Sequence, residues 1–229
     1  MDARAGAQVS ADDPDTWYAR RDQADAAQRA AAIWQRRAEA NPQDLESVWK
    51  LSRACYWLGG HAAEAARRGW LEKGVTAGQQ AAQIRPDRPE GYFWMAANMG
   101  ELAESFGLRA GLKYRGRIRS ALEKVLAIDP AFQEGSADRA LGRWYFKVPV
   151  LFGGSKAESE AHLRKSLSYD PASTATLYFL AETLFARDKD AEAVAALRKV
   201  LDVPFDPEWG PEDREFKAKA RGLLAQHGG

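Results

Sequence analysis

The sequence contains very little cysteine and few β-branched residues. The single cysteine, Cys55, excludes an internal disulfide, and its place in a helical pattern predicts a small buried side chain. Valine, isoleucine and threonine together number 18, against 43 alanines. Because β-branched residues favour strands and alanine favours helices, the composition predicts an all-α protein.

Long apolar runs and an excess of charge of one sign are also missing. No apolar stretch approaches the roughly 20 residues that a membrane-spanning helix needs, and Met1–Ala11 lacks the apolar centre of a signal peptide. Lysine and arginine number 33 and aspartate and glutamate 32, so the formal net charge is +1. This balance gives no electrostatic signal for nucleic acid, and no nucleic-acid partner is predicted.

The sequence carries no convincing signal of catalysis or metal binding. The three histidines stand far apart, at positions 61, 162 and 227, and His61 with Glu64 supplies too few ligands for a metal site. Gly69 and Gly74 have the spacing of a phosphate-binding loop, but Val75 stands where that loop requires lysine. We therefore predict that the protein is not an enzyme and holds no metal and no cofactor.

Four helical runs end in the same way, with a short polar stop followed by proline. The prolines are Pro42, Pro86, Pro130 and Pro171, spaced by 44, 44 and 41 residues. A fixed period is typical of a stacked repeat protein, and proline, which cannot continue a helix, closes each unit at the same place. The period predicts a single helical-repeat domain over residues 1–229.

The clearest unit lies between Thr176 and Val203. Its apolar residues recur at helical spacing on both sides of a polar turn, and two small residues, Ala181 and Ala193, stand where the helices cross. Antiparallel helices with small residues at the crossing are the tetratricopeptide pattern, whose unit has about 34 residues. The predicted fold is an all-α, tetratricopeptide-like solenoid of helical hairpins with a C-terminal capping helix. The predicted pairs cover residues 14–42, 45–86, 89–130, 136–171 and 174–203, and the cap covers 211–226.

The middle units exceed this length because of two apolar, glycine-bearing segments, 105–112 and 147–154. Both follow the first helix of a pair, so both are expected as loops at the same end of the stack. Apolar loops over the mouth of a helical stack are suited to gate a ligand. The alternative is that they fill a gap between longer helices.

Tryptophan is abundant, with eight residues among 229. Such rings either fill the space between stacked helices or line a cavity for an apolar ligand. Asn98, on an apolar helix, needs a hydrogen-bond partner, either a backbone carbonyl or a ligand. Arg139 can bind a carboxylate through two hydrogen bonds, unless it forms an ion pair with Glu134 or Asp138. The candidate ligand-binding residues are Trp57, Tyr92, Trp94, Asn98, Glu101, Phe106, Arg139, Trp144, Tyr145 and Phe152.

The segment from Arg139 to Lys156, RALGRWYFKVPVLFGGSK, resembles the signature of the T-component family of TRAP transporters, and residues 91–101 and 121–130 are similar to the same family. The resemblance covers residues 25–205. It implies a periplasmic, tetratricopeptide-like protein with a cavity or pore, which works beside a periplasmic substrate-binding protein. Some members of that family handle lipids or sterols. Association with the membrane and assembly into homo-oligomers stay open.

These observations together predict a periplasmic binding component of a transport system. It would hold an apolar small molecule, a lipid or sterol, in an aromatic-lined cavity and exchange it with a partner protein. The alternative is a tetratricopeptide scaffold that docks the substrate-binding protein of an organic-acid transporter and binds no ligand itself. A continuous cavity favours the first function, whereas aromatic residues wholly buried between helices favour the second.

Overall fold

The computed structural model describes residues 13–227, apart from the side chains of residues 108–110, and the N-terminal stretch Met1–Ala11 lies outside this part. Helices follow one another along the whole described chain and no strand occurs in it, so the predicted all-α solenoid is confirmed. The helices are α1 (Pro14–Ala19), α2 (Ala26–Ala40), α3 (Leu45–His61), α4 (Glu64–Ile84), α5 (Pro89–Ser105), α6 (Gly107–Ile128), α7 (Ser136–Lys147), α8 (Lys156–Tyr169), α9 (Thr174–Phe185), α10 (Asp190–Asp202) and α11 (Gly210–His227).

The four repeated prolines end helices through the residue that precedes each of them. Asn41, Arg85, Asp129 and Asp170 are the C-terminal caps of α2, α4, α6 and α8, with φ between −150° and −132° and ψ between 87° and 97°. A proline ring disfavours the helical conformation of the preceding residue. The same local steric effect therefore stops the second helix of four successive pairs.

The two apolar segments that were expected as loops have different structures. The predicted loop at 105–112 is wrong, because Phe106 alone separates α5 from α6, and Gly107, with φ +81°, allows the tight turn. Residues 148–154 do form a connection, which contains the short 3-10 turn Val150–Phe152. It ends at Ser155, whose hydroxyl accepts a hydrogen bond from the first turn of α8.

Two glycines bring the second and third pairs into backbone contact. A Cβ atom on Gly78 of α4 would lie 2.7 Å from the amide nitrogen of Met95 in α5. A Cβ atom on Gly91 of α5 would lie 2.4 Å from the amide nitrogen of Ala82 in α4. Because real Cβ atoms do not approach so closely, a larger residue at either position would push the helices apart.

The apolar core is distributed along the stack in three clusters. One joins α1 to α4 around Trp34, the second joins α4 to α7 around Met99 and Leu122, and the third joins α8 to α11 around Leu184. Each cluster connects helices that are neighbours in the sequence. This is the packing of a quasi-one-dimensional repeat stack, in which each unit contacts the next.

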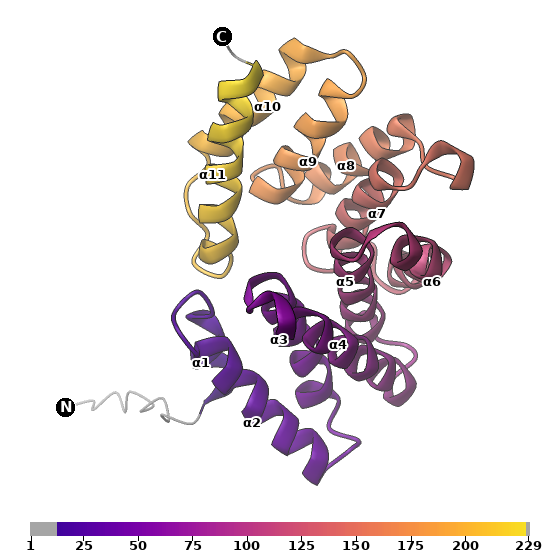
Figure 1. Ribbon diagram of the computed structural model, residues 1–229, viewed down its shortest axis with the longest axis vertical. Helices are drawn as coiled ribbons and strands as arrows, with labels where there is room; N and C mark the ends of the chain where they lie inside the picture. The colour runs from indigo at the N-terminus through magenta and orange to yellow at the C-terminus, as the bar shows by residue number, and fades with distance from the viewer. Residues whose placement is uncertain (1–12, 228–229) are drawn as a thin grey trace, which may run out of the picture.

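The stack bends into an almost closed ring, so that α11 returns to the first pair of helices (Figure 1). Arg21, in the α1–α2 connection, donates from Nε to Glu212 Oε1 at 2.9 Å and from a guanidinium NH₂ to the carbonyl oxygen of Glu208 at 2.8 Å. The indole N–H of Trp57 donates to the Arg21 carbonyl at 2.9 Å. We call the contact between the two ends the seam, and it consists of Arg21, Asp22, His61, Glu208, Glu212, Arg214 and Glu215.

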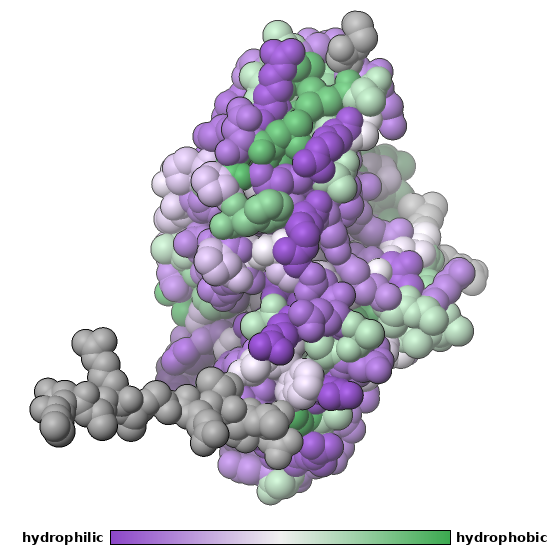
Figure 2. Space-filling view, turned by 90° about the vertical axis from the view of Figure 1, so that its left-hand side faces the viewer, coloured by the Kyte–Doolittle hydropathy of each residue, from purple (hydrophilic) through white to green (hydrophobic). Residues whose placement is uncertain are grey.

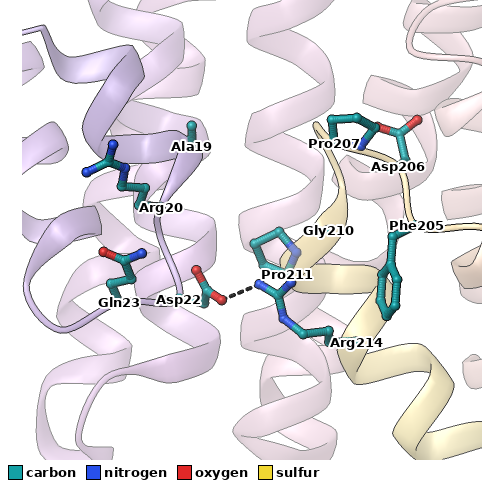
Figure 3. Close-up of a pocket in the computed structure, with 10 residues that line it drawn as sticks. All are labelled: Ala19, Arg20, Asp22, Gln23, Phe205, Asp206, Pro207, Gly210, Pro211 and Arg214. Carbon is teal, nitrogen blue, oxygen red and sulfur yellow. Dashed lines mark hydrogen bonds and ion pairs between the residues drawn. The ribbon is translucent and has the colours of Figure 1, made fainter.

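The seam is polar. Asp22 pairs with Arg214 beside a pocket of about 420 Å³ (Figure 3), and His61 pairs with Glu215. None of the three apolar clusters crosses it within the described residues. Polar side chains also cover most of the side of the molecule on which the two ends meet (Figure 2). The ring is therefore closed by charge and hydrogen bonds.

Candidate functional site

The ring encloses a cavity of about 1140 Å³. Nearly half of its lining residues come from the first helix of each pair, α1, α3, α5, α7 and α9. The others come from α4, α6 and α11 and from the connections that precede α7, α8, α9 and α11. A curved stack of hairpins turns the same helix of each pair toward its concave side. The cavity is therefore a direct consequence of the bend that closes the ring.

Aromatic side chains form much of the cavity wall. Tyr56 keeps 38% of its surface exposed, and its ring lies 5.9 Å from that of Trp94. Indole N–H groups fix two of the rings, because Trp57 donates to Arg21 and Trp144 donates to a backbone carbonyl at 3.0 Å. The aromatic residues on the wall are Tyr18, Tyr56, Trp57, Phe93, Trp94, Trp144, Phe152, Phe179, Phe205, Trp209 and Phe216.

Several charged side chains on the wall are paired between helices. Arg143 of α7 donates to both carboxylate oxygens of Glu104 on α5, at 3.0 and 2.9 Å, and to Glu182 of α9 at 2.6 Å. Burial alone would raise the pKa of Glu104, but Arg143 and Lys147 outweigh it and hold that pKa below its usual value. This network ties three inner helices together and keeps the carboxylate charged.

Arg139 differs from these residues. Its guanidinium makes no hydrogen bond or ion pair with any described residue, so neither pairing expected for it, with Glu134 or with Asp138, is formed. Asp138 instead accepts from Nδ1 of His162 at 2.7 Å and pairs with Lys165 at 3.3 Å. Burial lowers the pKa of Arg139, although nearby acidic groups act in the opposite direction. The cavity therefore contains an arginine without a partner.

The structure places six of the ten candidate residues on the wall of this cavity. They are Trp57, Trp94, Glu101, Arg139, Trp144 and Phe152. They come from α3, α5, α7 and the 3-10 turn, and the hairpin stacking brings them around one space. Four candidates do not line the cavity, and each has another partner.

Asn98 is one of the four, and it is fully buried between helices. Its Nδ2 donates to the carbonyl oxygens of Ser52 at 3.0 Å and Trp94 at 2.8 Å. The backbone carbonyl that was one of its two expected partners is therefore the partner it has, and its assignment to a ligand site is wrong. The amide joins α3 to α5 from inside the core.

Tyr92, Phe106 and Tyr145 also lie away from the cavity. The Tyr92 hydroxyl donates to a backbone carbonyl at 3.4 Å, and the guanidinium of Arg68 lies 4.3 Å from the centre of the Phe106 ring. The Tyr145 ring stacks on His162, with centres 5.4 Å apart. These placements correct their assignment as ligand contacts.

Several wall residues were not among the candidates. Tyr56 was overlooked beside Trp57, and Phe179 and Phe216 lie in the fifth pair and in α11. The periodicity of the apolar residues carries no signal that α11 returns to the first pair. The contribution of the C-terminal helix to the cavity therefore could not be predicted from local patterns.

Other features of the described chain offer no further chemistry. Cys55 is buried and unpaired, and burial raises the pKa of its thiol to about 12, which keeps it protonated. In the part of the chain that the structure describes, no three His, Cys, Asp or Glu side chains gather to hold a metal ion. None of the helices described is both long enough and apolar enough to cross a membrane. That the protein is not an enzyme stays a prediction.

Solved structures with similar folds are tetratricopeptide and MamA proteins. The tetratricopeptide protein TTC0263 of Thermus thermophilus aligns with a TM-score of 0.69 and 19% identity, over 93% of this chain and 95% of that chain. MamA of Desulfovibrio magneticus RS-1 aligns with a TM-score of 0.53 and 16% identity, over 83% of this chain and 94% of that chain. At these identities the likeness shows the fold. No curated protein significantly matches the sequence.

The assignment to the T-component family of TRAP transporters is wrong. The family model that matches the chain, over residues 13–152, is that of regulator of microtubule dynamics protein 1–3. The segment that suggested TRAP transporters contains the turn from α7 into α8, where Gly153 has φ +99° and a Cβ on Gly154 would lie 1.6 Å from a carbonyl oxygen. Its glycines are therefore explained by the geometry of this turn. The expected periplasmic location depends on the same resemblance and stays a prediction. Because the matching model spans more than half of the chain, the protein belongs to the family of regulator of microtubule dynamics proteins 1–3.

Proposed function

We propose that this protein is an interaction scaffold that holds an extended segment of a partner protein in the central cavity. The observation that carries this proposal is the size and composition of the cavity. Its volume of about 1140 Å³ is above the roughly 300–1,000 Å³ of most small-molecule sites. A peptide segment fills such a space with side chains and backbone together.

The chemistry of the wall supports a peptide occupant. Rings such as Tyr56 and Trp94 provide apolar contact area at low entropic cost. Polar groups on the same wall, including Glu101 and Arg139, can satisfy backbone amides and polar side chains that a peptide carries into the cavity. A mixed wall of this kind matches a peptide better than a wholly apolar molecule.

The comparisons are consistent with this function. Tetratricopeptide stacks form extended concave surfaces that are used for binding, and this chain has that fold. The family description refers to the regulation of microtubule dynamics. Because microtubules are protein polymers, regulating them involves contacts with proteins, which agrees with a scaffold.

A second candidate is the binding of a lipid or sterol, which both the continuous cavity and its aromatic wall favour. An apolar ligand would gain about 25 cal/mol for each Å² of apolar surface that it buries. Against it stand the charged groups of the wall, because contact with an apolar ligand would desolvate Arg139 without giving it a partner. The scaffold is therefore the function that we test first.

Two glycines provide a matched pair of variants for this test. Gly100 of α5 lines the cavity and Gly116 of α6 is exposed outside it, and a Cβ on either would meet no atom within 4 Å. Gly100→Trp fills the cavity and Gly116→Trp does not. Peptides selected from a random display library on the unmodified protein would be synthesised with a fluorescent label, and their affinities measured by anisotropy. We expect Gly100→Trp to weaken binding at least about tenfold, a loss of about 1.4 kcal/mol.

The Gly116→Trp variant should bind these peptides as the unmodified protein does. Equal binding to Gly100→Trp would place the peptide site elsewhere and refute the proposal. A selection that yields no peptide, while lipid from a bacterial extract co-purifies with the protein and is lost in Gly100→Trp, would favour the second candidate.

A further inference from the structure

The unpaired Arg139 is unusual for a half-buried charged side chain on the wall of a cavity. Charged residues that leave bulk water are nearly always paired, because desolvating a lone charge is costly. One turn further along α7, Arg143 has two carboxylate partners, at 2.9 and 2.6 Å. The surrounding protein lowers the pKa of Arg139, which agrees with a guanidinium that has no anion in contact with it. A guanidinium kept in this state suggests that its partner arrives from outside the chain.

The acidic groups around Arg139 do not take that place. Glu134, Asp170 and Glu212 influence its pKa, but none lies within ion-pair distance. Asp170 accepts a backbone N–H at 2.8 Å, and Glu212 is held by Arg21 at the seam. Glu134 belongs to the α6–α7 connection, where its φ of 56° fixes it in a left-handed turn. The space at the guanidinium stays free for another acceptor.

Tyr56 and Arg139 line the same cavity, and each influences the pKa of the other. The protein that surrounds the cavity raises the pKa of Tyr56 by desolvation, although 38% of the residue is exposed, so its hydroxyl stays protonated and can donate a hydrogen bond. A guanidinium fork and a phenol hydroxyl together suit a carboxylate, which accepts several hydrogen bonds in one plane. The Trp94 ring beside Tyr56 provides an apolar surface for the residues next to that carboxylate.

We infer that Arg139 binds the side-chain carboxylate of an aspartate or glutamate in the partner segment, flanked by apolar residues. This inference rests on the proposed scaffold function. It specifies one acidic residue and excludes an acidic run, because the cavity wall already includes eight carboxylates against six lysine and arginine side chains. A phosphate group or a second nearby acid would be repelled by this surplus.

The inference predicts the composition of the selected peptides. Sequences that bind the unmodified protein should share one Asp or Glu among apolar residues, and replacing it with the amide should weaken binding about 10- to 100-fold, as expected for a hydrogen bond to a charged group. The same replacement should change binding to Arg139→Gln less than about twofold. Arg139→Lys keeps the charge but loses the fork, so it should recover only part of the affinity. Arg198→Gln, which removes an exposed arginine outside the cavity, is the matched control.

Each result separates this inference from the function on which it rests. Peptides that are sensitive to Gly100→Trp but indifferent to Arg139→Gln would overturn the role of Arg139 and leave the scaffold intact. Peptides whose acid matters equally to the unmodified protein and to Arg139→Gln would place the carboxylate at another residue, which also overturns it. Failure to select any peptide would overturn the scaffold and the inference together.

Discussion

Replacing Arg21 with methionine tests whether charge holds the ring closed. The Arg21 side chain is 3% exposed and donates three hydrogen bonds across the seam, two to Glu212 and one to the Glu208 carbonyl. Methionine keeps most of the apolar volume against the Tyr18 ring but donates nothing. The variant therefore isolates the polar contribution of this contact.

The expected loss can be estimated from the burial of the two partners. Removing one partner of a buried ion pair costs about 3–5 kcal/mol. Glu212 keeps 23% of its side chain exposed, so water relieves part of its isolation, and we expect a loss of about 2–3 kcal/mol. A double-mutant cycle with Glu212→Gln should return a coupling energy of about 1–2 kcal/mol. Arg119→Met is the control, because the exposed Arg119–Glu123 pair is worth only about 0.3–0.5 kcal/mol.

Urea denaturation measures the loss of stability. The closure of the ring is measured as the distance between two spin labels, attached at the exposed positions Gln23→Cys and Arg221→Cys on opposite sides of the seam. Cys55 is fully buried, so it will not react with the label. Arg21→Met should lengthen and broaden the distance distribution, and so should about 1 M salt, at which the Debye length is about 3 Å. A stability loss below about 0.5 kcal/mol with an unchanged distance would show that charge does not close the ring.

Three further predictions concern other contacts. Burial alone would lower the pKa of His61, but hydrogen bonds to Glu215 and to the Trp57 carbonyl raise it. The His61–Glu215 pair therefore stabilises the fold below the ordinary histidine pKa of 6.5 and loses this effect as pH rises through the raised value. The difference in Tm between the unmodified protein and His61→Gln should shrink from about pH 6 to about pH 8.5, and a constant difference would contradict this. Gly78→Ala should lower the free energy of unfolding by about 1–3 kcal/mol, because the added methyl group overlaps α5. Gly116→Ala, on an open helix face, should raise the free energy of unfolding by about 0.5–1 kcal/mol. Equal effects of the two variants in denaturant titrations would refute the close approach of α4 and α5. Arg139→Met removes a half-buried charge that has no partner among the described residues, so it should raise stability by about 0.5–1 kcal/mol. A fall in Tm would mean that the charge is compensated inside the fold.

Part of the cavity wall was predictable and part was not. The aromatic residues of the inner helices, such as Trp57 and Trp94, stood out in the sequence because large rings on successive hairpins must meet at the same side of a stack. Asn98 looked equally suited to a ligand, yet it bonds a backbone carbonyl inside the core. One amide on an apolar helix has the same sequence pattern in either role, and only the position of the neighbouring helix decides between them.

Local interactions along the chain are sufficient to specify the helices and the residues at which they end. Each repeated proline forces the preceding residue out of the helical conformation, which is a steric effect between adjacent residues and needs no distant contact. Tertiary structure decided that the stack closes, because Arg21 and Glu212 are 191 positions apart in the chain and each resembles an ordinary surface charge until the curvature of the intervening pairs brings them together. The same curvature encloses the cavity and leaves Arg139 without a partner, since small rotations between neighbouring hairpins add up along the stack and are not encoded at any single residue.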